Sequence, residues 1–144
     1  MAEQDIQQEQ VEYSKLWWVT LLAGIIAAGV NVALYFLAQS IGFVDTLVPS
    51  FLDAANAPPF TIAIVGVSII FIAIGGVILW LIDLISEKPL TLWRNIAILA
   101  LLLSLVQPLF AFTEVNDIAL LIVLHIVAGV IAISMIPTMA KKTV

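Results

Sequence analysis

Four long stretches of this 144-residue chain contain no Asp, Glu, Lys or Arg, and they limit what it can fold into. They run over residues 16–44, 54–82, 95–113 and 118–140. A helix that crosses a hydrocarbon core of roughly 30 Å needs about 20 apolar residues, so each stretch can span a membrane. We therefore predict an all-α membrane protein with transmembrane helices over residues 16–41, 60–83, 92–112 and 118–140.

The composition excludes most other classes of protein. Hydrophobic residues make up 63% of the chain and charged residues 10%, whereas soluble domains are roughly half apolar and a quarter charged. Helices are expected because a lipid-exposed backbone must satisfy its own hydrogen bonds. The absence of cysteine excludes disulfides and thiol chemistry, and a net charge of −5 argues against nucleic-acid binding.

The basic residues predict the orientation of the spans. Lys15 precedes the first span, Lys88 and Arg94 flank the turn between the second and third, and Lys141 and Lys142 follow the fourth. Loops that carry Lys and Arg remain in the cytoplasm, so both termini and this turn are predicted to be cytoplasmic. Residues 1–15 then form a cytoplasmic polar tail, either disordered or an extension of the first helix, residues 16–140 the single transmembrane domain, and residues 141–144 a cytoplasmic basic tail. Trp17, Trp18, Trp80 and Trp93 are predicted to lie at the same boundary.

Residues 42–59 form the only long loop, on the predicted outer side. Its apolar residues recur at helical spacing, which favours a short interfacial piece broken near Pro49. This loop either caps the bundle or is an ordinary interfacial loop.

Each span carries one stripe of small or polar residues at steps of three and four. In the first span the stripe runs through Thr20, Gly24, Ala28, Asn31, Tyr35 and Gln39. Small residues and interhelical hydrogen bonds hold membrane helices together. The stripes therefore predict an antiparallel up-down bundle of four transmembrane helices with the stripes facing inward.

His125, the only histidine, lies in the fourth span about 10 Å from its outer end at 1.5 Å per residue. The stripes place it in the outer half of the membrane in a candidate buried polar cluster. The members of this cluster are Asn31, Tyr35, Gln39, Gln107 and His125.

Two interpretations of this cluster remain open. Its side chains can hydrogen-bond across the bundle and fix the register of the helices. Alternatively, an ionisable residue inside a membrane can mark a path for a proton or a small molecule. One histidine without cysteine is a poor metal or haem site, so no metal and no cofactor are predicted. The sequence carries no catalytic motif, and we predict that the protein is not an enzyme.

Residues 16–140 resemble a family of small bacterial membrane proteins known as domain of unknown function 6069. The resemblance rests on the stretches AGIIAAGVNVALYFLA, LSLVQPL and LHIVAGVIAI. Its motif residues are Asn31, Tyr35, Arg94, Ser104, Leu105, Pro108 and His125. The resemblance implies a four-helix protein of a bacterial membrane and no known activity.

These observations predict a small multi-pass protein of the bacterial cytoplasmic membrane. We expect it to act by association with itself or with another membrane protein. The alternative is a small transporter or proton-linked carrier with an outer-half site around His125. The lipid bilayer is the expected surrounding in both cases, nucleic acid is not expected as a partner, and the sequence identifies no small-molecule ligand.

Overall fold

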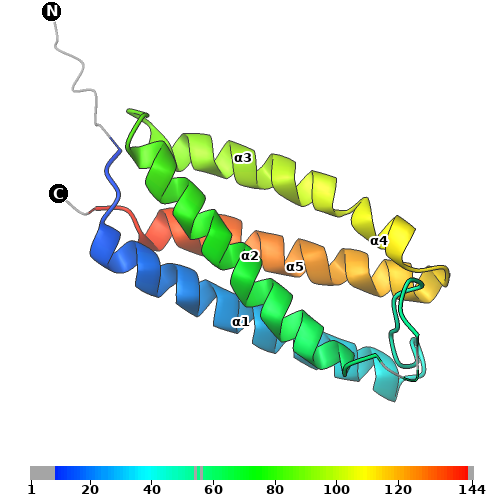
Figure 1. Ribbon diagram of the computed structural model, residues 1–144. Coiled ribbons are helices and arrows are strands. Elements are labelled where there is room, and N and C mark those ends of the chain that lie inside the picture. Colours follow the sequence, from blue (N-terminus) through cyan, green and yellow to red (C-terminus); the bar gives the residue numbers. More distant parts are fainter. Residues whose placement is uncertain (1–8, 54, 56, 143–144) are drawn as a thin grey trace, which may run out of the picture.

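The computed structural model describes residues 9–53, 55 and 57–142 and contains five helices. They are α1 (Tyr13–Ser40), α2 (Phe60–Asp83), α3 (Pro89–Ser104), α4 (Gln107–Ala111) and α5 (Val115–Met139) (Figure 1). Four segments are long and apolar enough to cross a membrane, because α3 and α4 together form one span over Pro89–Ala111. The protein is an all-α, multi-pass membrane protein, as the sequence predicts.

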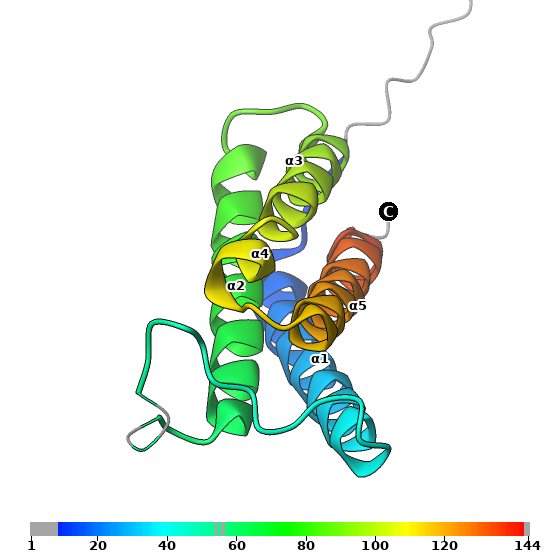
Figure 2. The same ribbon diagram turned by 90° about the vertical axis from the view of Figure 1, so that its right-hand side faces the viewer.

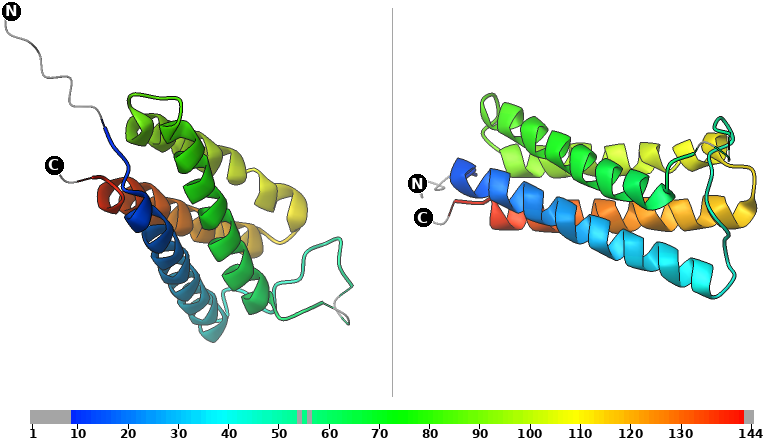
Figure 3. Two further views of the ribbon diagram at one scale, coloured as in Figure 1. Left: turned by 60° about the vertical axis from the view of Figure 1, so that its left-hand side comes forward. Right: turned by 60° about the horizontal axis from the view of Figure 1, so that its bottom comes forward.

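The four spans form an up-down bundle in which neighbouring spans run antiparallel (Figures 1 and 2). The start of α1 and the end of α5 lie at one end, which we call the terminal end (Figure 3). The other end, where residues 41–59 connect α1 to α2, is the loop end. Each half has its own buried apolar cluster: Leu16, Leu79 and Ile136 belong to the terminal-end cluster, and Leu47 and Leu124 to the loop-end cluster.

Glycines allow α1 and α2 to approach closely. A Cβ added at Gly24 would lie 3.2 Å from the Cα of Ile69, and one added at Gly76 would lie 2.7 Å from Oγ1 of Thr20. These two contacts also fix the antiparallel register of the pair. Lipid provides little hydrophobic drive for helices to associate, so such backbone proximity is a main source of their packing energy.

The third span is broken, which the sequence-based span of 92–112 does not anticipate. Helix α3 ends at Ser104, and α4 begins at Gln107 with Pro108 in its first turn. Pro108 has no N–H to donate to the carbonyl of Ser104. The chain instead makes a tight turn in which the N–H of Val106 donates to the carbonyl of Leu103 at 3.2 Å. The break therefore follows from the proline.

The first part of the segment between α1 and α2, residues 41–53, closes the loop end of the bundle. Val44 and Leu47 are buried in the loop-end cluster, and the N–H of Ser50 donates to the carbonyl of Ala111 at 2.9 Å. The described residues of this segment contain no helix, so the helical spacing of its apolar residues does not lead to a helix there. Of the two interpretations, the cap fits the burial of these side chains.

An extended strap made of residues 9–12 crosses the terminal end. Val11 pairs with Lys141 as an antiparallel bridge, the N–H of Glu12 donates to the carbonyl of Ala140 at 2.8 Å, and the N–H of Lys142 donates to the carbonyl of Gln10 at 2.9 Å. This part of the predicted tail is neither disordered nor an extension of the first helix. Residues 1–8 and 143–144, which complete the two predicted tails, lie outside the described residues.

Candidate functional site

Asn31 links α1 to α5 in the loop-end half of the bundle. It is only 4% exposed, and its Nδ2 donates to the backbone carbonyl of Leu124 at 3.1 Å. Its Oδ1 is buried and has no hydrogen-bond partner within the described part of the chain. The amide therefore makes one bond across the bundle and leaves one acceptor open.

His125 follows Leu124 on α5 and is half-buried. Its Nδ1 lies 2.7 Å from the backbone carbonyl of Leu121. A carbonyl only accepts, so Nδ1 must carry the proton and donate it. In the neutral ring Nε2 then holds a lone pair. The ring is tied back to its own helix, and no hydrogen bond joins it to another described element.

Tyr35 and Gln39 lie further toward the loop end of α1. Tyr35 is buried and its ring centroid lies 5.7 Å from those of Phe36 and Phe60. Nε2 of Gln39 donates to the backbone carbonyl of Asp45 at 3.2 Å, which holds the start of the loop against the helix. No hydrogen bond within the described residues joins either side chain to Asn31 or His125. Both side chains serve the cap of the bundle.

Gln107 lies outside the cluster, because its side chain is exposed. The prediction that it faces the bundle interior is wrong. The prediction assumes that the helical spacing of the third span continues to Gln107. The break before α4 interrupts this spacing. In α4 it is Pro108 and Ala111 that are buried. The structure thus places Asn31 beside the turn of α5 that carries His125. Gln39 bonds to the loop instead, and Gln107 is exposed, so neither of them joins this pair.

The sequence model of a protein family of unknown function, DUF6069, matches residues 11–142. The chain belongs to this family. No significant match was found among curated proteins or among solved structures.

The motif residues of the DUF6069 resemblance occupy three places in the fold. At the α1–α5 contact, Asn31 bonds to the carbonyl of Leu124, the residue before His125, and Tyr35 is buried one turn further along α1. Ser104 and Pro108 bracket the break in the third span, where Oγ of Ser104 donates to the carbonyl of Leu101 at 2.7 Å. Arg94 lies exposed in the second turn of α3, at the terminal end.

Trp93 has a role that the sequence does not reveal. It is 2% exposed, and its indole N–H donates to the backbone carbonyl of Gly75 at 2.7 Å. The sequence places Trp93 with the other three tryptophans at the membrane boundary, but this one packs inward between α3 and α2. The glycine pair Gly75 and Gly76 leaves room on α2 for a large ring, but the sequence does not indicate which aromatic residue fills it.

Glu9 is a second residue that sequence reasoning misses. Its Oε2 accepts the backbone N–H of Thr91 at 3.0 Å, and its Oε1 accepts the hydroxyl of the same residue at 2.7 Å. Helix α3 has no side-chain cap of its own. Glu9, from a distant part of the chain, accepts a hydrogen bond from a free backbone N–H in the first turn of α3. Burial raises the pKa of Glu9, but the hydrogen bonds from Thr91 outweigh burial and the net pKa is lowered.

The acidic and histidine side chains do not gather into a metal site. Within the described residues no group of three or more His, Cys, Asp or Glu side chains could hold a metal ion. The polar groups of the candidate cluster can accept or donate hydrogen bonds, and they offer no nucleophile paired with a base.

Proposed function

We propose that this protein is a non-enzymatic integral protein of the bacterial cytoplasmic membrane that acts by association with itself or with another membrane protein. In this proposal both termini and the turn between α2 and α3 are cytoplasmic, because all five basic residues lie at the terminal end. The observation that carries the proposal is an unpartnered small-residue patch on α1.

This patch consists of Gly29 and Ala33, which lie one turn apart on the exposed side of α1. A Cβ added at Gly29 would meet nothing within 4 Å, whereas Gly24 and Gly76 are in close contact with another helix. Glycine inside a helix is less favourable than alanine by about 1 kcal/mol. No described residue packs against Gly29 closely enough to offset this cost. A second helix that approaches the patch would do so, since small residues four apart let helix backbones come close.

The polar interior supports a structural role for most of its groups. Oγ1 of Thr20 donates to the carbonyl of Leu16 at 2.7 Å, His125 bonds to Leu121, and Asn31 bonds to Leu124. The first two bonds lie within one helix, whereas the bond from Asn31 joins α1 to α5, and such an interhelical bond contributes roughly 0.6 kcal/mol. The Asn31 bond fixes the register of α1 against α5, and none of the three bonds needs a ligand.

The patch can be tested by energy transfer between donor- and acceptor-labelled copies in lipid vesicles. Gly29→Leu combined with Ala33→Leu should raise the dissociation constant of the homo-oligomer about tenfold or more, which corresponds to about 1.4 kcal/mol. Ala100→Leu, an exposed small-to-large change on α3, is the matched control and should leave it unchanged. Equal effects of the two changes would exclude the patch as the interface.

Native mass spectrometry of the protein extracted gently from its own membranes tests the broader proposal. A homo-oligomer or a stable complex with another membrane protein supports association. A monomer without a protein partner, obtained under conditions that preserve known membrane complexes, contradicts it.

One observation favours the alternative of a small transporter or proton-linked carrier. The buried Oδ1 of Asn31 is an open acceptor beside the turn that carries His125, whose Nε2 makes no hydrogen bond within the described residues. A carrier built on these groups loses its pH-dependent flux into proteoliposomes in His125→Ala. The association proposal expects the same variant to show only a modest fall in melting temperature.

A further inference from the structure

A hollow of about 270 Å³ lies at the terminal end, between the start of α3 and the end of α5. Both of these helix ends are visible at the same end of the bundle in Figure 1. Leu90 and Pro137 line its apolar side, and Arg94 and Lys141 bring two positive charges to it. It is therefore a basic hollow between two membrane spans, at the level where the spans end.

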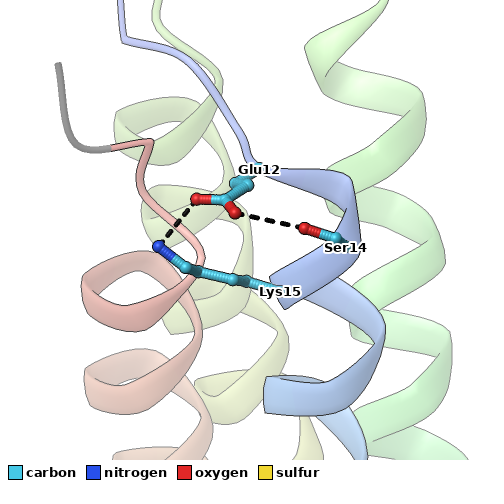
Figure 4. Close-up of polar contacts among 3 residues, drawn as sticks. All are labelled: Glu12, Ser14 and Lys15. Carbon is cyan, nitrogen blue, oxygen red and sulfur yellow. Dashed lines mark hydrogen bonds and ion pairs between the residues drawn. The ribbon is translucent and has the colours of Figure 1, made fainter.

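Arg94 and Lys141 are not neutralised at contact distance by other described residues. By contrast, Nζ of Lys15 forms an ion pair with Glu12 at 2.7 Å (Figure 4), and Nζ of Lys142 donates to Oε1 of Gln10 at 3.2 Å. Arg94 forms no ion pair within the described residues. Arg94 and Lys141 are the two cations that line this hollow, and neither forms an ion pair within the described residues.

Glu9 also lines the hollow but does not fill the role of that anion. Both of its carboxylate oxygens accept hydrogen bonds from Thr91, at 3.0 and 2.7 Å. Its attraction to Lys141 acts over a longer distance than an ion pair. With Glu9 counted, two positive charges and one negative charge leave the hollow with a net charge of +1.

The hydroxyl groups in the hollow are already occupied as donors. Thr91 donates to Glu9, and Oγ1 of Thr138 donates to the backbone carbonyl of Ser134 at 2.6 Å. An incoming group must therefore be recognised by the guanidinium and the ammonium. A guanidinium offers a planar fork that matches two phosphate oxygens, and an ammonium acts as a compact charge beside it.

The depth of the hollow fits the headgroup region of a bilayer. Arg94 is five residues into α3, about 7 Å from its start at 1.5 Å per residue. Ile98, one turn further along α3, is exposed and apolar. Basic pockets between spans on the cytoplasmic side are suited to anionic lipid headgroups, whose chains then lie on the apolar helix surface below.

We propose that this hollow binds the phosphate group of an anionic membrane lipid, with Arg94 and Lys141 as its ligands. The lipid would add a polar link between α3 and α5, which already pack together through apolar side chains such as Leu90 and Ile136. The proposal does not depend on which partner the protein has.

The test uses the full chain in nanodiscs of phosphatidylcholine and phosphatidylglycerol in a four-to-one ratio. Lipids that remain bound are then identified by native mass spectrometry. The wild type should retain phosphatidylglycerol over phosphatidylcholine, and R94Q/K141Q should reduce that preference about tenfold. K15Q/K88Q removes the same charge from the same end outside the hollow and should keep the preference. Equal losses in the two double variants, or no preference in the wild type, would overturn the proposal.

A second arm distinguishes a lipid from free phosphate. Inorganic phosphate is added to the protein in nanodiscs of phosphatidylcholine alone, and the melting temperature is measured. A rise in the wild type that is absent from R94Q/K141Q supports the site and shows that it also accepts soluble phosphate. No rise, together with selective retention of phosphatidylglycerol, assigns the site to lipid, and failure of both arms excludes it.

Folding of the variants is checked separately. Arg94 and Lys141 are exposed side chains, so R94Q/K141Q should keep the wild-type helical circular dichroism in phosphatidylcholine. R94K keeps the charge and removes the fork, and it should retain an intermediate preference for phosphatidylglycerol. If R94K binds as weakly as R94Q while remaining folded, the geometric part of the proposal is wrong.

Discussion

Asn31 combines one hydrogen bond across the bundle with one buried acceptor that has no donor. A hydrogen bond between membrane helices contributes roughly 0.6 kcal/mol, whereas a buried unsatisfied polar atom costs about 1–3 kcal/mol in proteins. The unfolded chain in a membrane also lacks water, which reduces this second value. The two effects therefore nearly cancel for the folding of the single chain.

Replacing Asn31 by leucine, which has a similar volume, should consequently change the free energy of unfolding by less than about 1 kcal/mol. The measurement is reversible unfolding in bicelles. Asn31→Ala is the comparison, because it also leaves a cavity and should be the more destabilising of the two. A loss of more than about 2 kcal/mol in Asn31→Leu would mean that Oδ1 holds a stabilising ligand in the membrane.

Gly76 and Gly66 lie on the same helix but in opposite environments, which allows a matched comparison. A Cβ at Gly76 would lie 2.7 and 2.8 Å from Oγ1 and Cγ2 of Thr20, while one at Gly66 would meet nothing within 4 Å. Gly76→Ala should therefore destabilise the α1–α2 pair by about 1–3 kcal/mol through overpacking. Gly66→Ala should be neutral or stabilising by up to about 1 kcal/mol, because alanine is the better helix former.

Unfolding of both variants in the same bicelles gives the two values. If Gly66→Ala is as destabilising as Gly76→Ala, then Gly66 also contacts a helix, and that helix must come from another molecule.

At the level of helices, the sequence predicts the four membrane spans, because these depend on local hydropathy. The absence of charge from four stretches is sufficient for the four spans, and the stripe of the first span correctly predicts the burial of Asn31 and Tyr35. The break before α4 changes which side chains face inward, so Gln107 could not be placed by extending the spacing from Ser104. Trp93 and Glu9 could not be placed either, because their partners Gly75 and Thr91 are set by tertiary packing.

The strap of residues 9–12 is an element whose stability should depend on pH through Glu9. The folded-state pKa of Glu9 is lowered below the ordinary value of 4.5. The stabilising effect of the Glu9 carboxylate is therefore present above about pH 4.5 and is lost as the pH falls through the folded-state pKa. A carboxylate at an exposed helix N-terminus contributes about 0.3–1 kcal/mol. Glu9→Gln should lower stability by this order at pH 7 and by less at pH 3.

Hydrogen exchange of the N–H of Thr91 measures this effect locally. Exchange should be faster in Glu9→Gln than in the wild type at pH 7, after correction for the intrinsic rate, and the difference should shrink on acidification. Glu12→Gln is the control, since Glu12 binds Lys15 and Ser14 and does not contact α3. A pH-independent difference would show that the charge of Glu9 is not what holds Thr91.

For the whole molecule, the distribution of charge predicts one orientation in the membrane. The five basic residues lie at the terminal end, and the loop end carries acidic residues without Lys or Arg. Because the chain contains no cysteine, single cysteines can report the accessibility of each end without background labelling. Asp53 lies exposed in the loop between α1 and α2, and Glu87 lies exposed in the turn between α2 and α3.

In intact bacterial cells, Asp53→Cys should react with a membrane-impermeant maleimide, and Glu87→Cys should react only after the cells are opened. Glu87 is chosen because its replacement leaves all five basic residues in place, so the determinant of orientation is unchanged. The reverse labelling would place the Arg94–Lys141 hollow on the outer side. A lipid bound there would then come from the outer leaflet, and the positive-inside argument would fail for this chain. Labelling of both positions in intact cells would indicate two orientations, as expected if five basic residues provide too weak a bias.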